Sequence, residues 1–289
     1  MILKSLRTYF KNVLLGYYPD TEIESFFNLL SGRILKMKRI DISQNLYAVV
    51  SGKKYDKFQN AIDRLKKYEP IQYIVGDTEF YGLVFKVNPS VLIPRPETEE
   101  LVQWIIECHS EQSEESKLKI LDIGTGSGCI AVSLAKNLPN AKVYALDISK
   151  EALKIAKLNA TNNDVDVAFV EADVLNSMDW NLVFENLKFD IIVSNPPYVR
   201  ELEKEAMSAN VLNHEPHLAL FVKDNDALLF YRNITETSQA ILKSNGQLYF
   251  EINENLGERT KELLINNDFN SIELKKDIFD KDRMIKAIK

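Results

Sequence analysis

The chain has 289 residues, of which 45% are hydrophobic and 27% are charged, an ordinary globular composition with room for two domains. Its formal net charge of −6 argues against a large surface for duplex nucleic acid, because neutralising phosphates requires a cationic face. The two cysteines, Cys108 and Cys129, do not form a disulfide framework, and the three histidines lack metal-ligand spacing, so we expect no structural disulfide and no metal.

The first ten residues mix polar and apolar side chains and lack the apolar core and cleavage site of a signal peptide. No apolar run approaches the roughly 18 to 20 residues that a membrane-spanning helix needs. We therefore expect a protein of the reducing cytoplasm without a membrane partner. Separately, we expect it to be a monomer.

Residues 1–70 are predicted to form a helical domain. Apolar residues recur there at spacings of three and four, and Pro19 supplies a start signal for one helix. The two apolar faces comprise Ile23, Phe26, Phe27, Leu30 and Ile34, and then Phe58, Ala61, Ile62, Leu65 and Tyr68. These side chains are more typical of a helical core than of ligand contacts.

Residues 71–96 are predicted to form a β-hairpin linker, because apolar and polar residues alternate there and Gly76 and Gly82 mark turns. Residues 97–289 are predicted to form a second domain. It opens with a helix over residues 97–108, followed by a polar acidic run at residues 109–116 that we interpret as an exposed loop without a function.

Strands alternate with helices in the remainder of the chain, which favours a mainly parallel sheet. This alternation stops at the end, where residues 271–276 and 283–288 are two strand-like runs without an intervening helix. The predicted fold class is therefore α/β.

A glycine-rich turn follows the apolar strand at residues 119–123 and precedes an apolar helix. The turn consists of Gly124, Thr125, Gly126, Ser127 and Gly128. Glycines at such a position let the backbone approach a ligand at the edge of an open α/β sheet. A dinucleotide fingerprint needs a small residue where Cys129 lies, so this spacing disfavours NAD.

Two further strands end in carboxylates. Asp147 lies 23 residues after Gly124 and can accept both ribose hydroxyls of an adenosine-type ligand, although it can also cap the helix that begins near Ser149. After the third strand, Asp173 is placed to reach an adenine amino group, with Val174 beside it. A solvated loop acid explains Asp173 equally well.

The segment Asn195, Pro196, Pro197 and Tyr198 follows the buried strand at residues 189–194. Two prolines supply no N–H, so carbonyl groups at this tip can be aimed at a ligand. The Asn195 side-chain oxygen and the Pro196 carbonyl can both accept from one planar –NH2 group, while Tyr198 offers a flat apolar face. A simple turn at the end of a strand is the alternative.

These motifs, in this order, resemble S-adenosylmethionine-dependent methyltransferases, and within them the peptide chain release factor glutamine methyltransferases. The resemblance covers nearly the whole chain. It includes residues 69–76 and 79–82, the Pro-Arg-Pro-Glu-Thr-Glu run at residues 94–99, Glu215-Pro216, Ala219-Leu220 and Asp282-Arg283. The run at residues 94–99 separates this family from the nucleic-acid methyltransferases that share only Asn-Pro-Pro-Tyr.

The resemblance implies a Rossmann-like seven-stranded sheet, an N-terminal helical domain that recognises the substrate, and an antiparallel terminal hairpin. It implies S-adenosylmethionine as cofactor, held by residues 124–128, Asp147 and Asn195. Residues 195–198 are then the catalytic residues that contact the substrate amide. The implied substrate is the glutamine of the Gly-Gly-Gln motif in class-one peptide chain release factors, with no nucleic-acid substrate.

Some residues depart from the family pattern. Asn253 and Leu256 replace a glycine and a glutamine after the strand that ends near Glu251, so that loop is expected to differ in shape. Val174 replaces a bulkier residue, and Trp180 is an alternative contact for adenine.

An amide nitrogen is a poor nucleophile, so the cofactor must supply a good leaving group and the protein must align the reacting atoms. No general base is required, because the methylated nitrogen loses its proton to water afterwards. Glu215 is the nearest candidate carboxylate, with loop anchoring as its other role.

Two other functions stay open on the residues alone. An adenine amino methyltransferase would use the same tetrapeptide on a flipped base, but would need a basic recognition domain. A cofactor-binding regulator without catalysis would not need residues 195–198 intact.

Overall fold

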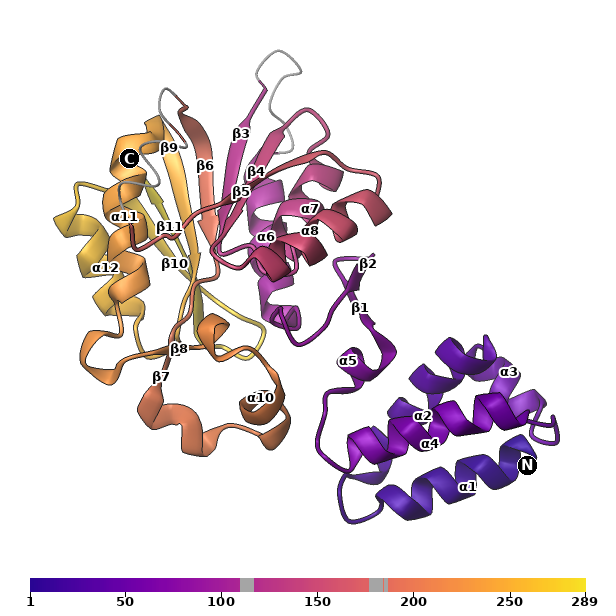
Figure 1. Ribbon diagram of the computed structural model, residues 1–289. Coiled ribbons are helices and arrows are strands. Elements are labelled where there is room, and N and C mark those ends of the chain that lie inside the picture. The colour runs from indigo at the N-terminus through magenta and orange to yellow at the C-terminus, as the bar shows by residue number, and fades with distance from the viewer. Residues whose placement is uncertain (110–116, 177–183, 185–186) are drawn as a thin grey trace. The chain divides into compact units, whose positions relative to one another are not determined.

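The computed structural model describes residues 1–109, 117–176, 184 and 187–289. It divides into two compact units, which we describe separately (Figure 1). The N-terminal unit consists of Met1–Asp77 with Ser208–His214. The C-terminal unit consists of Thr78–Met207 with Glu215–Lys289.

The N-terminal unit is helical. Its helices are α1 (Leu3–Leu14), α2 (Asp20–Leu35), α3 (Arg39–Gln44), α4 (Gly52–Leu65), α5 (Ile71–Val75) and α10 (Ala209–His214). The centre of its core contains three aromatic rings, with Phe27 in contact with Phe10 and Phe58 at centroid distances of 5.5 and 5.6 Å. The predicted apolar faces of α2 and α4 are buried, except that Ile34 is half-buried. Tyr68 is exposed because α4 already ends at Leu65.

A β-hairpin follows α5 in the chain. Strands β1 (Asp77–Phe80) and β2 (Leu83–Lys86) form a two-stranded sheet. The two residues between them, Tyr81 and Gly82, have φ angles of 49° and 70°. Positive φ at both central residues matches a type I′ turn, whose twist suits a tight hairpin. A hairpin is therefore present within the predicted segment, but it is shorter than predicted, because residues 71–75 form the helix α5 and the two strands end at Lys86.

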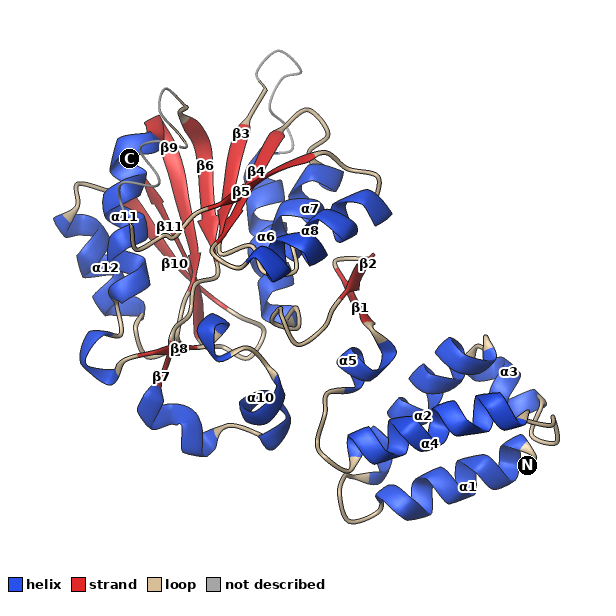
Figure 2. Cartoon of the chain, viewed as in Figure 1, coloured by secondary structure: helices blue, strands red, loops and turns tan. Residues whose placement is uncertain are grey.

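A seven-stranded sheet in the order β10-β11-β9-β6-β3-β4-β5 forms the centre of the C-terminal unit (Figure 2). Strands β3, β4, β5, β6 and β9 are parallel, and β11 and β10 add an antiparallel hairpin at one edge. Their bounds are β3 (Lys119–Ile123), β4 (Lys142–Asp147), β5 (Val167–Glu171), β6 (Phe189–Ser194), β9 (Leu242–Glu251), β10 (Asn270–Lys276) and β11 (Asp282–Ile288). The predicted α/β fold and the seven-stranded sheet are confirmed.

Helices cover both faces of this sheet (Figure 1). On β3, Ile120 contributes to the core beneath α6 (Pro96–His109), α7 (Cys129–Asn137) and α8 (Lys150–Asn162), whereas Leu121 contributes to the core beneath α11 (Leu229–Ile241) and α12 (Gly257–Asn266). Successive side chains of a strand point to opposite faces, so the central strands must be apolar on both. This requirement explains the continuous apolar runs in the sequence.

Short elements complete the C-terminal unit beyond β6. They are β7 (Val199–Arg200), η1 (Glu201–Ala206), η2 (His217–Ala219), β8 (Phe221–Val222) and η3 (Asp224–Asp226), where η denotes a 3-10 helix. Strands β7 and β8 pair in parallel, which holds the chain beside the end of β6.

One detail of the predicted acidic loop is wrong. His109 was expected at its start, but the residue is buried as the last residue of α6, with its Nε2 3.2 Å from Gln247 Oε1. An apolar neighbourhood and a polar partner on β9 extend the helix by one residue. Residues 110–116 and Trp180 lie outside the described residues.

Among the helices that the structure describes, none is long and apolar enough to span a membrane. The described ranges also contain no group of three or more His, Cys, Asp or Glu side chains arranged to hold a metal ion.

Candidate active site

A cavity of about 400 Å³ lies at the carboxyl ends of the central parallel strands, within the size range of small-molecule sites. Strand β3 has β4 on one side and β6 on the other, so the chain crosses over in opposite directions there, and ligands of open α/β sheets bind at such a point. The predicted residues that line the cavity are Gly124, Gly126, Asp147, Asp173, Val174, Asn195, Pro196 and Pro197.

The glycine turn serves two purposes. A side chain at Gly126, which has a φ of 55°, would meet no atom within 4 Å, so the missing Cβ leaves open space for a ligand. A Cβ at Gly128 would lie 3.0 Å from Ala156 Cβ, so that glycine permits close packing of α7 on α8. Thr125, Ser127 and Gly128 do not line the cavity, and two of the five turn residues therefore face it.

Asp147 holds the turn in place from the end of β4. Its Oδ2 accepts a hydrogen bond from Gly126 N and its Oδ1 accepts one from Ser149 N, both at 2.8 Å. Burial raises the pKa of this carboxyl group, whereas the backbone hydrogen bonds from Ser149 and Gly126 oppose that rise. Each carboxylate oxygen can still accept a further bond, as two ribose hydroxyls require.

The alternative role of Asp147 as a helix cap is met by another residue. Ser149 is the N-cap of α8, and its side chain accepts from Ala152 N at 3.2 Å. Asp147 bonds the backbone of Ser149 but does not cap the first turn, so its carboxylate remains on the cavity wall.

Asp173 and Val174 line the cavity from the segment that follows β5. Asp173 Oδ1 accepts from Leu175 N at 2.9 Å, which tightens the turn. Asp173 is therefore built into the wall of the cavity rather than extended into solvent from a distant loop.

Asp122 lies beneath the turn with no exposed surface. Its Oδ2 accepts from Thr125 Oγ1 at 2.6 Å and from Ala131 N at 3.2 Å, while its Oδ1 is buried and has no partner among the described residues. Burial raises the pKa of Asp122 to about 7, against the lowering effect of these two bonds and with a smaller raising contribution from Asp147.

This raised pKa predicts a pH-dependent stability. The folded state retains the Asp122 proton to about pH 7, whereas a carboxyl with the ordinary pKa of 3.8 loses it much earlier. Folded protein therefore binds more protons in that window, and the free energy of unfolding falls as pH rises through it, by up to about 4 kcal/mol. Asp122→Asn should flatten the pH dependence measured by urea unfolding between about pH 5.5 and 7.5. Exposed Asp166→Ala should leave it unchanged, and an unaltered slope in Asp122→Asn would contradict the expectation.

The tetrapeptide after β6 is split between the cavity and the core. Asn195, Pro196 and Pro197 line the cavity, but Tyr198 does not. The Tyr198 hydroxyl donates to Glu251 Oε1 at 3.1 Å, and its ring packs against the core beneath α11 and α12. The Asn195 amide donates from Nδ2 to Thr98 Oγ1 at 3.2 Å.

Thr98 and Glu251 were not predicted as site residues. Glu251 ends β9 and is 1% exposed, and its Oε2 accepts from Thr98 Oγ1 at 2.6 Å. The sequence held a signal for Glu251, because it is a charged residue at the end of an apolar strand. Ser194 pairs with Phe250 in the register of β6 and β9, so the next residue of each strand lies at the same sheet edge.

Glu215 anchors a loop. Its Oε2 accepts from Ile93 N at 3.1 Å and its Oε1 accepts from Arg95 at 2.6 Å. These contacts tie the segment around residues 91–95 to the loop before η2, and Glu215 does not line the cavity. Loop anchoring is therefore the role that its contacts support.

Asn253, a departure from the family pattern, also organises a loop. Its Nδ2 lies 3.3 Å from both the Tyr198 carbonyl and Glu203 Oε2, and its Oδ1 accepts from Asn255 N at 2.9 Å. The amide thus bridges the segment that follows the tetrapeptide to the end of β9.

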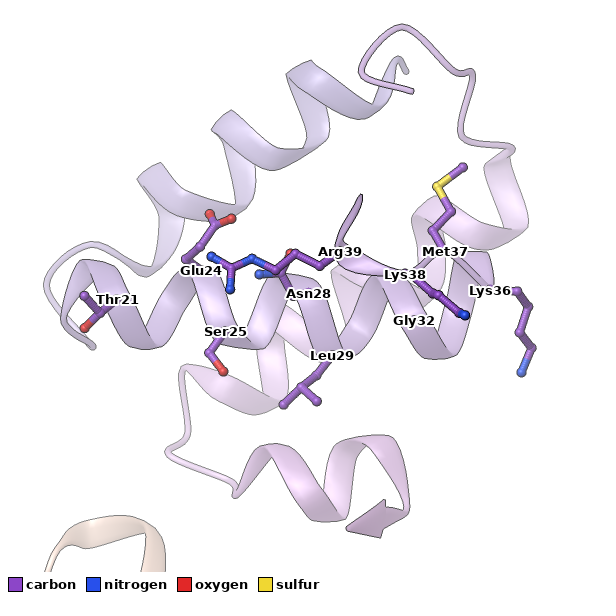
Figure 3. Close-up of a pocket in the computed structure, with 10 residues that line it drawn as sticks. All are labelled: Thr21, Glu24, Ser25, Asn28, Leu29, Gly32, Lys36, Met37, Lys38 and Arg39. Carbon is purple, nitrogen blue, oxygen red and sulfur yellow. The ribbon is translucent and has the colours of Figure 1, made fainter. Parts of the chain in front are cut away.

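A second cavity, of about 780 Å³, lies in the N-terminal unit (Figure 3). Glu24, Asn28 and Leu29 project from α2, and the side chain of Arg39 extends over that helix. Glu24 already forms an ion pair with Arg7. None of the predicted site residues lies in this cavity.

The most informative comparison is with curated relatives. A release factor glutamine methyltransferase of Flavobacterium psychrophilum is 52% identical over 99% of both chains. One from Bacteroides thetaiotaomicron is 45% identical over 99% of both chains. The chain belongs to the release factor glutamine methyltransferase family. Bacillus subtilis has a further member, 39% identical over 87% of this chain and 86% of its own.

Family descriptions match both parts of this methyltransferase. Residues 6–76 match the PrmC N-terminal domain, and residues 103–220 match the methyltransferase small domain. The second match contains the cavity-lining turn, Asp147 and the tetrapeptide. It ends before Glu251, so the Thr98–Glu251 contact joins residues on either side of it.

Solved structures show that the fold is that of Rossmann-like methyltransferases. The T. thermophilus 16S rRNA methyltransferase RsmC, in complex with AdoMet and guanosine, gives a TM-score of 0.52 at 18% identity over 74% of this chain and 49% of its own. The hMettl16 catalytic domain gives 0.54 at 15% identity over 82% of both chains.

The cavity of this methyltransferase suits an adenosine-type cofactor. Gly126 leaves space beside the turn, and Asp147 presents a carboxylate with remaining acceptor capacity. The wall near Asp173 combines a carboxylate with apolar Val174, and the lining as a whole is mostly apolar. A flat heterocycle with a polar amino edge fits this combination.

Proposed function

We propose that this protein transfers a methyl group from S-adenosylmethionine to the side-chain amide nitrogen of the glutamine in the Gly-Gly-Gln motif of class-one peptide chain release factors. The observation that carries the proposal is the intact Asn-Pro-Pro-Tyr segment, with Asn195 and Pro196 on the cavity wall of a family member. Both residues offer acceptors to one –NH2 group, which is what an unmodified glutamine presents.

Cofactor binding is assigned to the strand ends. Gly124 and Gly126 allow the cofactor to approach the protein backbone closely, and Asp147 accepts hydrogen bonds from the ribose hydroxyls. Asp173 and Val174 border the adenine, while Asn195 separates the cofactor from the substrate. Thr125, Ser127 and Gly128 support this arrangement by shaping the turn.

The protein contributes alignment and electrostatics. The cofactor supplies an activated methyl group on a sulfonium leaving group. Asn195 and Pro196 hold the substrate nitrogen with its lone pair toward the methyl carbon, an effect that can be worth roughly 7 to 11 kcal/mol. Their oxygens also stabilise the partial positive charge that grows on nitrogen. Pro197 stiffens the segment, and Tyr198 fixes its far end through Glu251.

No side chain is assigned as a general base. Among the described residues that line the cavity, there is no histidine or cysteine, and Glu215 is engaged with Ile93 and Arg95. An amide nitrogen that has gained a methyl group is acidic enough to release its proton to water.

The helical region at residues 1–70 is assigned to recognition of the folded release factor, residues 71–96 to a linker, and residues 97–289 to catalysis. A short loop with glycines fits a narrow cavity, and a second contact with the folded factor would increase its effective concentration there. The protein acts as a monomer in the cytoplasm, the compartment of translation.

Mass spectrometry with isotopically labelled cofactor tests this function. We expect one labelled methyl group on the Gly-Gly-Gln glutamine, transferred to intact release factor much faster than to a short peptide. The difference should shrink when residues 1–70 are removed, with cofactor binding confirming that the truncated chain is folded. Label on adenine of DNA or RNA, with none on release factor, would establish a nucleic-acid methyltransferase instead.

A further inference from the structure

A chain of hydrogen bonds leads from the cavity wall to a buried carboxyl group. Asn195 Nδ2 donates to Thr98 Oγ1 at 3.2 Å, and Thr98 Oγ1 donates to Glu251 Oε2 at 2.6 Å. The Tyr198 hydroxyl donates to the second oxygen, Oε1, at 3.1 Å. Thr98 is 2% exposed and Glu251 is 1% exposed, so water does not compete for these bonds.

The number of protons available in this series of hydrogen bonds determines which way the Asn195 amide faces. A carboxylate only accepts hydrogen bonds, and a threonine hydroxyl has one proton. Because Thr98 gives that proton to Glu251, it can only accept from Asn195, which must therefore present its –NH2 to Thr98. The carbonyl oxygen Oδ1 of Asn195 then points away from Thr98. It has no hydrogen-bond partner among the residues that the structure describes.

We propose that Thr98 and Glu251 are positioning residues that hold the Asn195 amide with its oxygen toward the substrate, and so make the site select a group that donates N–H. This inference rests on the proposed methylation of a glutamine amide. It assigns a role to two residues from α6 and β9 that lie outside the tetrapeptide.

The geometry supports Glu251 as the acceptor of both hydroxyl protons, because each of its two carboxyl oxygens faces one hydroxyl group. Burial raises the pKa of Glu251 above its ordinary value, and the bonds from Thr98 and Tyr198 and the charge of Arg283 on β11 only partly oppose that rise. Glu97 on α6 has a smaller raising effect. The Tyr231 hydroxyl from α11 is engaged by the backbone carbonyl of Glu251 at 3.3 Å, so it does not compete for the carboxylate.

Loss of the Thr98 hydroxyl would remove the constraint on Asn195. Its amide could then rotate and present –NH2 to the –NH2 of the substrate. Both groups are donors, so no hydrogen bond would form between them. The rotated amide would instead suit a carboxylate, which only accepts. Wild-type protein should therefore prefer glutamine to glutamate at the substrate position, and protein without the hydroxyl should lose much of that preference.

Three variants test the inference. Thr98→Val keeps the shape of the side chain and removes its hydroxyl proton, whereas Thr98→Ser retains the hydroxyl. Thr260→Val is the control: it makes the same change at a buried threonine of α12 whose hydroxyl has no partner among the described residues. We expect kcat to fall roughly 10- to 100-fold in Thr98→Val, as for a misplaced reacting group. Thr98→Ser should recover most of the loss, and Thr260→Val and the cofactor Kd should change little.

Competition measures the selectivity directly. Release factor with glutamate in place of the Gly-Gly-Gln glutamine is added as an inhibitor of methylation. It should inhibit wild-type and Thr98→Ser protein poorly and Thr98→Val protein more strongly, relative to the KM of each for the normal factor. An unchanged ratio in Thr98→Val, or an equal loss of kcat in Thr98→Ser, would overturn the inference.

A measurement without substrate separates this inference from the proposed function. The side-chain amide signal of Asn195 in a ¹⁵N NMR spectrum is identified by its loss in Asn195→Ala. Its hydrogens should exchange slowly with water in wild-type and Thr98→Ser protein and much faster in Thr98→Val. Equal exchange in all three would refute the orientation even if release factor is methylated. Slow exchange in the wild type with no methylation would refute the function alone.

Discussion

Replacing Asn195 with alanine is expected to lower the rate of methyl transfer roughly 100-fold or more. The change removes one preorganised polar contact to the reacting nitrogen, which is typically worth about 3 to 4 kcal/mol. Cofactor affinity should fall far less, because Gly126 and Asp147 remain. Thr98 keeps its bond to Glu251, so the buried part of the network is retained. Single-turnover kinetics measures the transfer step, and calorimetry measures cofactor binding.

A matched control separates this effect from general damage. Asn266 is exposed on α12, and Asn266→Ala should leave both the rate and the cofactor Kd unchanged. Normal turnover by Asn195→Ala, or a defect confined to cofactor binding, would show that Asn195 does not orient the substrate.

The cofactor half of the site follows from local sequence. Strands β3 and β4 are buried on both faces, so they appear as apolar runs whose polar ends are conspicuous. Parallel strands bring those ends to one edge, and this places Gly126 and Asp147 together. No long-range information is needed for that prediction beyond the α/β alternation.

The support for Asn195 does not follow in the same way. Thr98 and Glu251 are 153 positions apart, and their contact depends on α6 packing against β9, the strand next to β6. Strand order is a tertiary property that apolar patterns do not report. Tyr198 illustrates the same limit, since its ring was predicted as a face for the substrate but its hydroxyl is directed to Glu251. Burial of that carboxyl group requires a donor, and Tyr198 supplies it.

Replacing Asp147 with alanine is expected to weaken cofactor binding roughly 100-fold or more. Hydrogen bonds to a charged group contribute about 1.5 to 3 kcal/mol each, and two ribose hydroxyls would be lost from the carboxylate. The backbone N–H groups of Gly126 and Ser149 would also lose their acceptor, so the turn would become less ordered. Calorimetric titration with S-adenosylmethionine and with NAD measures the effect. Wild-type protein should bind the first and not the second.

The control is an acidic residue at the amino ends of the parallel strands, opposite the ends that line the cavity. Asp166 is exposed just before β5, and Asp166→Ala should bind the cofactor like the wild type. If Asp147→Ala keeps wild-type affinity while folded, ribose recognition must lie elsewhere on the cavity wall. Tight binding of NAD by the wild type without binding of S-adenosylmethionine would reject the cofactor itself, because the glycine spacing would then serve a pyrophosphate.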